Sequence, residues 1–123
     1  PLYGYLLLIF NVSNQKLDSF SSWNFGPKKS DHINVKDVVN YLSKITKFEK
    51  ILIKKSDFIE NNDLRLDSSK SKKLLKWKSV LNIKKGLDFT ADWYLEYFKN
   101  GEIKTFNQIK CYYERFSLIN KKD

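Results

Sequence analysis

Apolar residues recur at helical spacing in several stretches of the chain. Residues 2–16 begin with the run "LYGYLLLIF", which is apolar on every side of a helix and therefore predicts burial against more than one layer. Residues 35–45 carry apolar side chains at helical spacing directly after Asn34, a residue type that favours the N-cap position. The same spacing predicts two later helices, over residues 84–100, closed by Gly101, and over residues 106–119.

Alternating apolar and polar positions predict short strands between these helices. Trp23 and Phe25 flank a polar residue in "WNFGP", which predicts a strand that ends in a turn. β-Branched residues predict a second strand at 51–53, and "LRLD" predicts a third at 64–67. Strands that alternate with helices indicate an α/β protein.

The lysine-rich stretch "LRLDSSKSKKLLKWKS" is expected to be a corner between a strand and a helix. Asp67 is placed to cap the helix, Ser68 and Ser69 fill its first turn, and Trp77 anchors its far end in the core. Its lysines are interpreted mostly as solvated surface.

Length and composition limit the chain to one domain or part of one. The 123 residues are 41% hydrophobic, which suffices for a single modest core. Methionine is absent and the first residue is Pro1, so we expect a processed or truncated product. The apolar run at the start is shorter than the roughly 20 residues of a membrane span, which predicts no membrane segment.

The net charge of +9 suits a polyanionic partner, but the residue types weaken that interpretation. Only Arg65 and Arg115 are arginines, so the bidentate contacts that specify bases or phosphates are scarce. We therefore expect no specific nucleic-acid partner. The lone Cys111 forms no internal disulfide and lies far from His32 in sequence, which predicts a cytoplasmic protein without a metal site.

The residues of this chain do not form a recognisable catalytic set. The four glycines are scattered, so no dinucleotide-binding loop is present, and no tyrosine has a lysine four positions later. Tyr41 with Lys44 is the nearest approach, and we interpret that pair as a solvated helix face. The acid pairs Glu60 with Asp63 and Asp88 with Asp92 are expected at the surface, as is His32. The thiol of Cys111 is expected to be buried or half-buried, and the aromatic residues 93–98 are expected in the core.

Three segments nevertheless resemble a known family. They are "PLYGYLLL" leading to "WNFGP", then "LRLDSSKSKKLLKWKS", then "GLDFTADWYLEYFKNGE" with "QIKCYY". In this order and at this spacing they resemble the carboxyl-terminal part of the CDP-glucose 4,6-dehydratases, which belong to the extended short-chain dehydrogenase/reductase superfamily. Together they cover almost the entire chain.

The resemblance implies that residues 1–123 are the substrate-side lobe of a Rossmann-type enzyme whose NAD-binding part is missing from this chain. The parent enzyme, expected to be a homo-oligomer, would bind NAD and convert CDP-glucose to CDP-4-keto-6-deoxyglucose for surface polysaccharides. The glycine-rich loop and the Tyr/Lys pair of the family belong upstream of Pro1, so this chain alone is expected neither to turn over nor to bind NAD.

The resemblance transfers one substrate-binding residue and no catalytic, cofactor-binding or metal-binding residue. Glu60 matches the glutamate of a His-Glu pair that lies near the nucleotide in the family, while Ile59 occupies the histidine position. The family's Gly-Trp-x-Pro ending is here Lys76, Trp77, Lys78 and Ser79. Two other functions stay open from the residues alone: a small basic module that binds nucleic acid or another polyanion, and a non-catalytic structural subunit.

Overall fold

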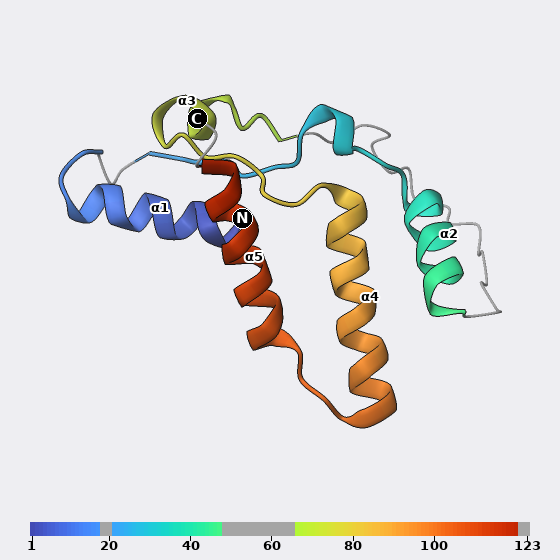
Figure 1. Ribbon diagram of the computed structural model, residues 1–123. Coiled ribbons are helices and arrows are strands. Elements are labelled where there is room, and N and C mark those ends of the chain that lie inside the picture. The colour runs from blue at the N-terminus through green and yellow to red at the C-terminus, as the bar shows by residue number, and fades with distance from the viewer. Residues whose placement is uncertain (18–20, 48–65, 121–123) are drawn as a thin grey trace. The chain divides into compact units, whose positions relative to one another are not determined.

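The computed structural model describes residues 1–17, 21–47 and 66–120, and this part of the chain is helical. Figure 1 shows its elements, which are α1 (Leu2–Ser13), the 3-10 turn η1 (Lys29–Asp31), α2 (Val35–Thr46), α3 (Ser69–Leu74), α4 (Ile83–Asn100) and α5 (Thr105–Asn120). No strand occurs within these ranges, so the α/β prediction, including the Rossmann-type lobe, is wrong for the described residues. The strand predicted at 51–53 lies outside them.

The described residues belong to two compact units. The first contains α1, the segment 21–28 and the segment 66–79 with α3. The second contains η1, α2, α4 and α5. Each unit therefore joins segments that lie far apart in the sequence.

The core of the first unit is small and aromatic. Phe25, Leu75 and Trp77 are buried, and the Phe25 ring meets the Trp77 ring edge-to-face at 5.4 Å between centroids. α1 supplies the partly buried Tyr3, Leu7 and Leu8. A Cβ atom at Gly4 would lie 2.4 Å from Cδ1 of Phe25, so α1 approaches this core through a residue without a side chain.

The remaining surface of α1 is not covered by described residues. Its exposed apolar side chains are Leu2, Tyr5, Leu6, Ile9 and Phe10. The all-round apolar pattern predicted burial on more than one side, and the described part of the unit buries α1 on one side.

The segment from Asn24 to Gly26, at the end of the predicted strand, is held by hydrogen bonds that each involve a side chain, and no neighbouring strand pairs with it among the described residues. The backbone N–H of Gly26 donates to Oγ of Ser68 at 2.8 Å, and Oγ of Ser71 donates to the carbonyl of Asn24 at 2.6 Å. The amide of Asn24 donates to the carbonyl of Asp67 at 3.3 Å. Because backbone groups need partners of some kind, two serines here do what a β-ladder does in a sheet.

α3 begins one residue later than a cap at Asp67 would require. Its N-cap position is Ser68, although Oδ1 of Asp67 still accepts the N–H of Ser69 at 2.9 Å. After α3 the chain turns through Lys76, whose φ of 54° lies in the left-handed region, and this brings Trp77 back against the core. The prediction that Trp77 anchors this end is confirmed, since it is 4% exposed.

The second unit confirms the helices that local signals predicted. The side chain of Asn34 accepts the N–H of Asp37 at the start of α2, and Gly101 closes α4 with a φ of 68°. α2 packs against α4. α5 follows α4 in Figure 1 and is tied to it by the amide of Gln108, which donates to the carbonyl of Phe89 at 2.7 Å.

Candidate functional site

The substrate-binding residue transferred by resemblance, Glu60, lies outside the described residues, as do Ile59 and Asp63. The nucleotide contact assigned to Glu60 therefore stays a prediction. The site has to be sought among the charged and aromatic groups of the described ranges.

Two residues with reactive side chains lie at the surface. His32 is exposed directly after η1. Cys111 on α5 is also exposed, so the expectation of a buried or half-buried thiol is wrong. Within the described ranges, no group of three or more histidine, cysteine or acidic residues is arranged to hold a metal ion.

Tyr41 interacts with an acid instead of a lysine partner of the dehydrogenase type. Its hydroxyl donates to Oδ1 of Asp88 at 2.5 Å, which links α2 to α4. This hydrogen bond to a carboxylate raises the pKa of Tyr41 above 10, with smaller contributions from burial and from the negative charge of Asp88. Lys84 lies over the Tyr41 ring, 5.7 Å from its centroid, and Nζ of Lys85 lies 3.9 Å from Oδ2 of Asp88. The arrangement connects two helices and leaves the phenol protonated.

The two members of the second predicted acid pair, Asp88 and Asp92, are hydrogen-bonded to different partners. Asp92 accepts a hydrogen bond at 3.0 Å from Nζ of Lys104, which precedes α5. The same bond raises the pKa of Lys104. Asp88 accepts a hydrogen bond from Tyr41, and Asp92 accepts one from Lys104. Because the two acids have different partners, they stabilise the second unit and do not share a proton.

The aromatic residues of α4 form a stacked group that is largely exposed. Trp93 stacks on Tyr97 with 5.2 Å between ring centroids, and Tyr94 stacks on Phe98 with 6.0 Å. Tyr94, Tyr97 and Phe98 are 52%, 45% and 74% exposed. The prediction that these residues form core is therefore wrong for three of the four in the described chain.

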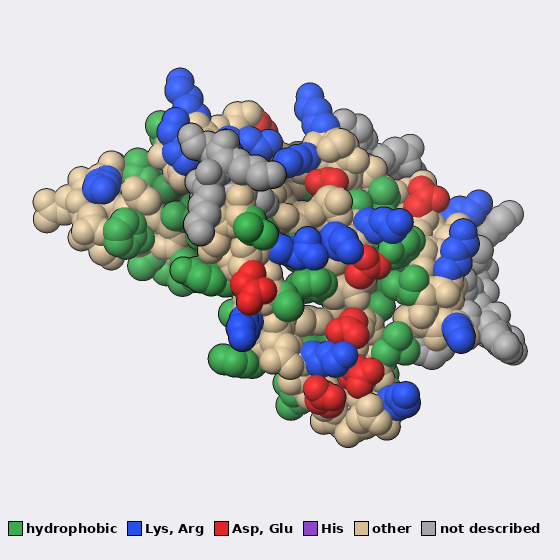
Figure 2. Space-filling model, viewed as in Figure 1, with side chains coloured by type: hydrophobic (Ala, Val, Ile, Leu, Met, Phe, Trp, Pro, Cys, Tyr) green, Lys and Arg blue, Asp and Glu red, His purple; other side chains and the backbone are tan. Residues whose placement is uncertain are grey.

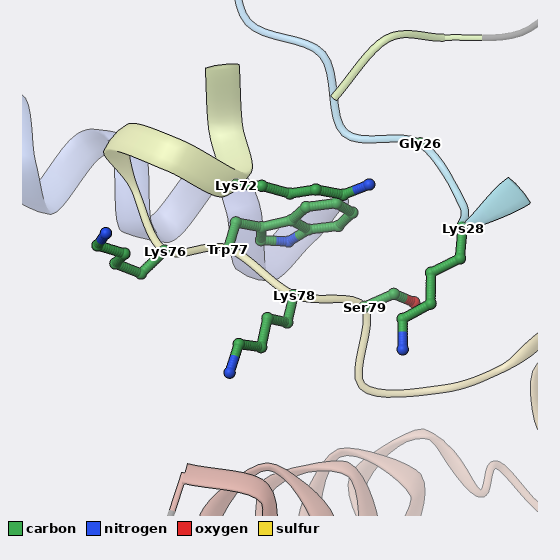
Figure 3. Close-up of a pocket in the computed structure, with 7 residues that line it drawn as sticks. All are labelled: Gly26, Lys28, Lys72, Lys76, Trp77, Lys78 and Ser79. Atoms are coloured by element: carbon green, nitrogen blue, oxygen red, sulfur yellow. The ribbon is translucent and has the colours of Figure 1, made fainter. Parts of the chain in front are cut away.

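A pocket in the first unit is lined by four lysines. Its volume is about 370 Å³, and Figure 3 shows the residues that line it, which are Gly26, Lys28, Lys72, Lys76, Trp77, Lys78 and Ser79. None of these lining residues is acidic. On the face shown in Figure 2, by contrast, acidic and basic side chains are interspersed over much of the surface. The sequence suggested that these lysines were spread over solvated surface. In the structure, four of them line one pocket.

One hydrogen bond and one left-handed turn shape this pocket, whose lining comes from segments more than forty residues apart. The hydrogen bond between Gly26 and Ser68 holds the loop that carries Lys28 against the start of α3. The left-handed turn at Lys76 then returns Trp77 to the core, so its indole forms an apolar wall between exposed lysines. In Figure 3, Lys72 runs along the indole, Lys28 and Lys78 extend to the same side, and Lys76 points away.

The glycines of this chain do not fit a dinucleotide cradle. The Phe25 ring occupies the space beside Gly4, and Gly26 lies against Leu66 and Ser68. Gly86 lies inside α4, and Gly101 caps that helix at its carboxyl end, where the dipole disfavours a phosphate. None of the four glycines therefore forms a dinucleotide cradle, and the expectation that this chain does not bind NAD stays a prediction.

Comparisons with protein-family models, with curated proteins and with solved structures found no match for this chain. None of the helices in the described ranges combines the length and the apolar character that crossing a membrane requires. The observations with which to argue function are therefore the residues and their geometry.

Proposed function

We propose that this chain is the carboxyl-terminal, substrate-side part of a cytoplasmic CDP-glucose 4,6-dehydratase, and that it is inactive by itself. The upstream part of that enzyme would bind NAD and supply the catalytic tyrosine and lysine. The chemistry would oxidise the sugar at C4, eliminate water across C5 and C6, and return the hydride to C6. The role of this chain would be to shape the substrate side of the site.

The observation that carries the proposal is that two of the three resembling segments meet in one core. The third segment belongs to the second unit. Gly4 of "GYLLL", Phe25 of "WNFGP" and Trp77 of the lysine-rich corner contact one another in sequence order. Their contact supports the view that they were selected as one structure.

The backbone at Lys76 adds a second, independent support. In the family, a glycine stands at this position, before the tryptophan, and here Lys76 adopts a φ of 54°. A residue with a Cβ atom pays about 1 kcal/mol or more for that conformation, whereas glycine adopts it freely. The backbone that favours glycine is thus present although the glycine has been replaced.

The decisive experiment uses the protein encoded by the complete reading frame that contains these codons. It is incubated with NAD and with CDP-glucose that carries deuterium at C4, and the sugar nucleotide is followed by mass spectrometry and NMR. We expect loss of one water and deuterium at C6, because the hydride removed from C4 is returned there. The 123-residue chain, tested in parallel, should neither convert CDP-glucose nor bind NAD in calorimetry.

Two controls define the specificity of that result. UDP-glucose and GDP-mannose should react more slowly than CDP-glucose if the cytidine is recognised. A complete reading frame without a glycine-rich turn and a Tyr-x-x-x-Lys sequence, or a full protein that leaves CDP-glucose unchanged, would rule out the proposal.

A further inference from the structure

We infer that a second pocket, formed by α4 and α5 in the second unit, binds an uncharged, flat heteroaromatic ring that presents an N–H donor at its edge. This aromatic pocket has a volume of about 290 Å³, and its lining residues are Phe89, Thr90, Trp93, Tyr94 and Gln108. The site goes beyond the proposed function and does not rest on it, because its own geometry defines the ligand.

The walls of the aromatic pocket are the open end of the ring stack on α4. Trp93 stacks on Tyr97, which lies one turn toward the carboxyl end of the helix. Tyr94 stacks in the same direction on Phe98. Thr90 lies one turn toward the amino end and lines the pocket, so the pocket is on the other side of both rings. The stack therefore covers one face of each ring, and the opposite face borders the pocket.

Two of these rings meet at a corner that fits a flat ligand. The planes of Trp93 and Tyr94 differ by 78°, with 5.1 Å between the ring centroids. An aromatic ring that stacks on one of them meets the other edge-to-face, and aromatic pairs favour both arrangements. A saturated ring has no π system for either contact. The volume, close to the lower end of the roughly 300–1,000 Å³ of small-molecule sites, limits the ligand to one or two rings.

Gln108 supplies the polar contact of the aromatic pocket. Its Nε2 donates to the carbonyl of Phe89 at 2.7 Å, so Oε1 is the amide atom that is left to accept a hydrogen bond. No group among the described residues donates to this oxygen. A ring N–H would provide the donor. The described lining residues carry no charge, which favours a neutral ligand over an ion.

Two-dimensional ¹H–¹⁵N NMR of the 123-residue chain, titrated with indole, tests the inference. The side-chain N–H of Trp93, which donates to Oγ1 of Thr105 at 2.9 Å, provides a signal from the pocket wall. This signal should shift and saturate as indole is added. The corresponding signals of Trp23 and Trp77, which belong to the first unit, should stay in place.

1-Methylindole is the matched ligand, because it keeps the flat ring system but has no N–H to donate to Gln108. It should bind about fivefold more weakly than indole, as the loss of one hydrogen bond implies. Since 1-methylindole is the more apolar of the two, binding by apolar contact alone would give it the higher affinity. That result would overturn the inference.

Two tyrosines provide a matched pair of variants. Tyr94→Leu removes a wall of the pocket and should weaken indole binding about tenfold. Tyr113→Leu removes an exposed ring of α5 that does not line the pocket, and it should leave the affinity unchanged. Equal weakening by both substitutions would mean that indole adheres to exposed rings in general, which overturns the inference.

Thr90→Trp is a second test that leaves every aromatic wall intact. Thr90 is exposed, and an indole side chain at this position should fill the pocket and abolish binding. Unchanged binding to this variant would contradict the site. Absence of a saturable shift in the unaltered chain, with circular dichroism showing that it is helical, overturns the inference as well.

A further ligand distinguishes the source of the ring. Adenosine presents an amino donor on a purine, so adenosine binding that is lost in Tyr94→Leu would assign the site to nucleobases. Binding of indole without adenosine would assign it to smaller heterocycles, and both results support the inference. Tighter binding of methyl glucoside, which is a saturated ring, contradicts it.

Discussion

Ser68 is small and buried, and its hydroxyl accepts a hydrogen bond from a backbone group that would otherwise lack a partner among the described residues. Gly26 is buried beside Leu66 and Ser68, and its N–H donates to Oγ of Ser68 with 2.8 Å between nitrogen and oxygen. The hydroxyl of Ser71, which is fully buried, donates a hydrogen bond to the backbone carbonyl of Asn24. Two hydroxyl groups thus fix the loop on which the aromatic core and the lysine pocket both depend.

Replacement of Ser68 by alanine should therefore destabilise the first unit by about 1–3 kcal/mol, because a buried N–H loses its acceptor. Urea denaturation followed by circular dichroism measures this change. Ser69→Ala is the matched control, since Ser69 is exposed on the same helix and its replacement should change stability by less than about 0.5 kcal/mol. Equal effects of the two substitutions would mean that the hydroxyl of Ser68 has no special role.

At the scale of the element, helices α1 and α4 each contain a glycine, and the two glycines differ in surroundings. Gly4 of α1 lies against the ring of Phe25, whereas nothing lies within 4 Å of a Cβ atom built at Gly86 of α4. Glycine lowers helix stability by about 1 kcal/mol relative to alanine in both places. In α1 the close approach of Phe25 explains why a glycine is present despite this loss of helix stability. In α4 no described contact explains it.

The same substitution at these two positions should have opposite effects. Gly86→Ala is expected to stabilise the chain by about 0.5–1 kcal/mol through helix propensity. Gly4→Ala gains the same propensity but pushes a methyl group into Phe25, at a cost of about 1–3 kcal/mol, so a net loss of about 1 kcal/mol is expected. Thermal unfolding of both variants measures the difference, and stabilisation by Gly4→Ala would contradict the described packing of α1.

The hydrogen bond between Tyr41 and Asp88 gives the contact of α2 with α4 a dependence on pH. The pKa of Tyr41 is raised in the folded chain, so its protonated form is favoured by folding. The resulting stabilisation is fully present below the unfolded-state value of about 10 and is lost as pH rises through the higher folded-state pKa.

Tyr41→Phe tests this sign. The variant should melt at a lower temperature than the unaltered chain at pH 8, and the difference between them should shrink as pH rises beyond about 10. Comparing the two chains at each pH cancels the titration of the lysines they share. A difference that stays constant to pH 11 would show that the hydroxyl contributes nothing through its proton.

Local signals predicted the helices of the described chain well, whereas the strand predicted at Trp23 to Phe25 is not formed. The capping residues Asn34 and Gly101 act within one turn of their own helix, so the sequence contains everything their effect requires. The alternation in "WNF" is real, since Trp23 and Phe25 pack inward, but the backbone of Asn24 and of the following Gly26 is hydrogen-bonded to Ser71 and Ser68. Hydrogen bonds to a serine more than forty residues away do not change the local pattern of apolar and polar residues. An extended segment held by such side chains was therefore predicted as a strand.

At the scale of the whole molecule, the pocket depends on contacts that no local pattern encodes. The lysines between 72 and 78 were interpreted as solvated surface, and they are indeed exposed. Their proximity to Lys28 follows from the folding of the first unit, which brings distant segments together through Gly26 and Ser68. The exposure of Cys111 and of the α4 aromatics was mispredicted for the same reason, because burial is decided by partners elsewhere in the chain.

The burial of Trp77 also makes the chain a built-in optical probe. Trp77 is shielded in the first unit, Trp23 of the same unit has Nζ of Lys70 4.4 Å from its ring centroid, and Trp93 belongs to the second unit. With Trp23 and Trp93 both replaced by phenylalanine, fluorescence reports on Trp77 alone, and its emission maximum shifts to the red when this indole meets water. Iodide quenching of that emission would then measure how readily an anion reaches the wall between the lysines.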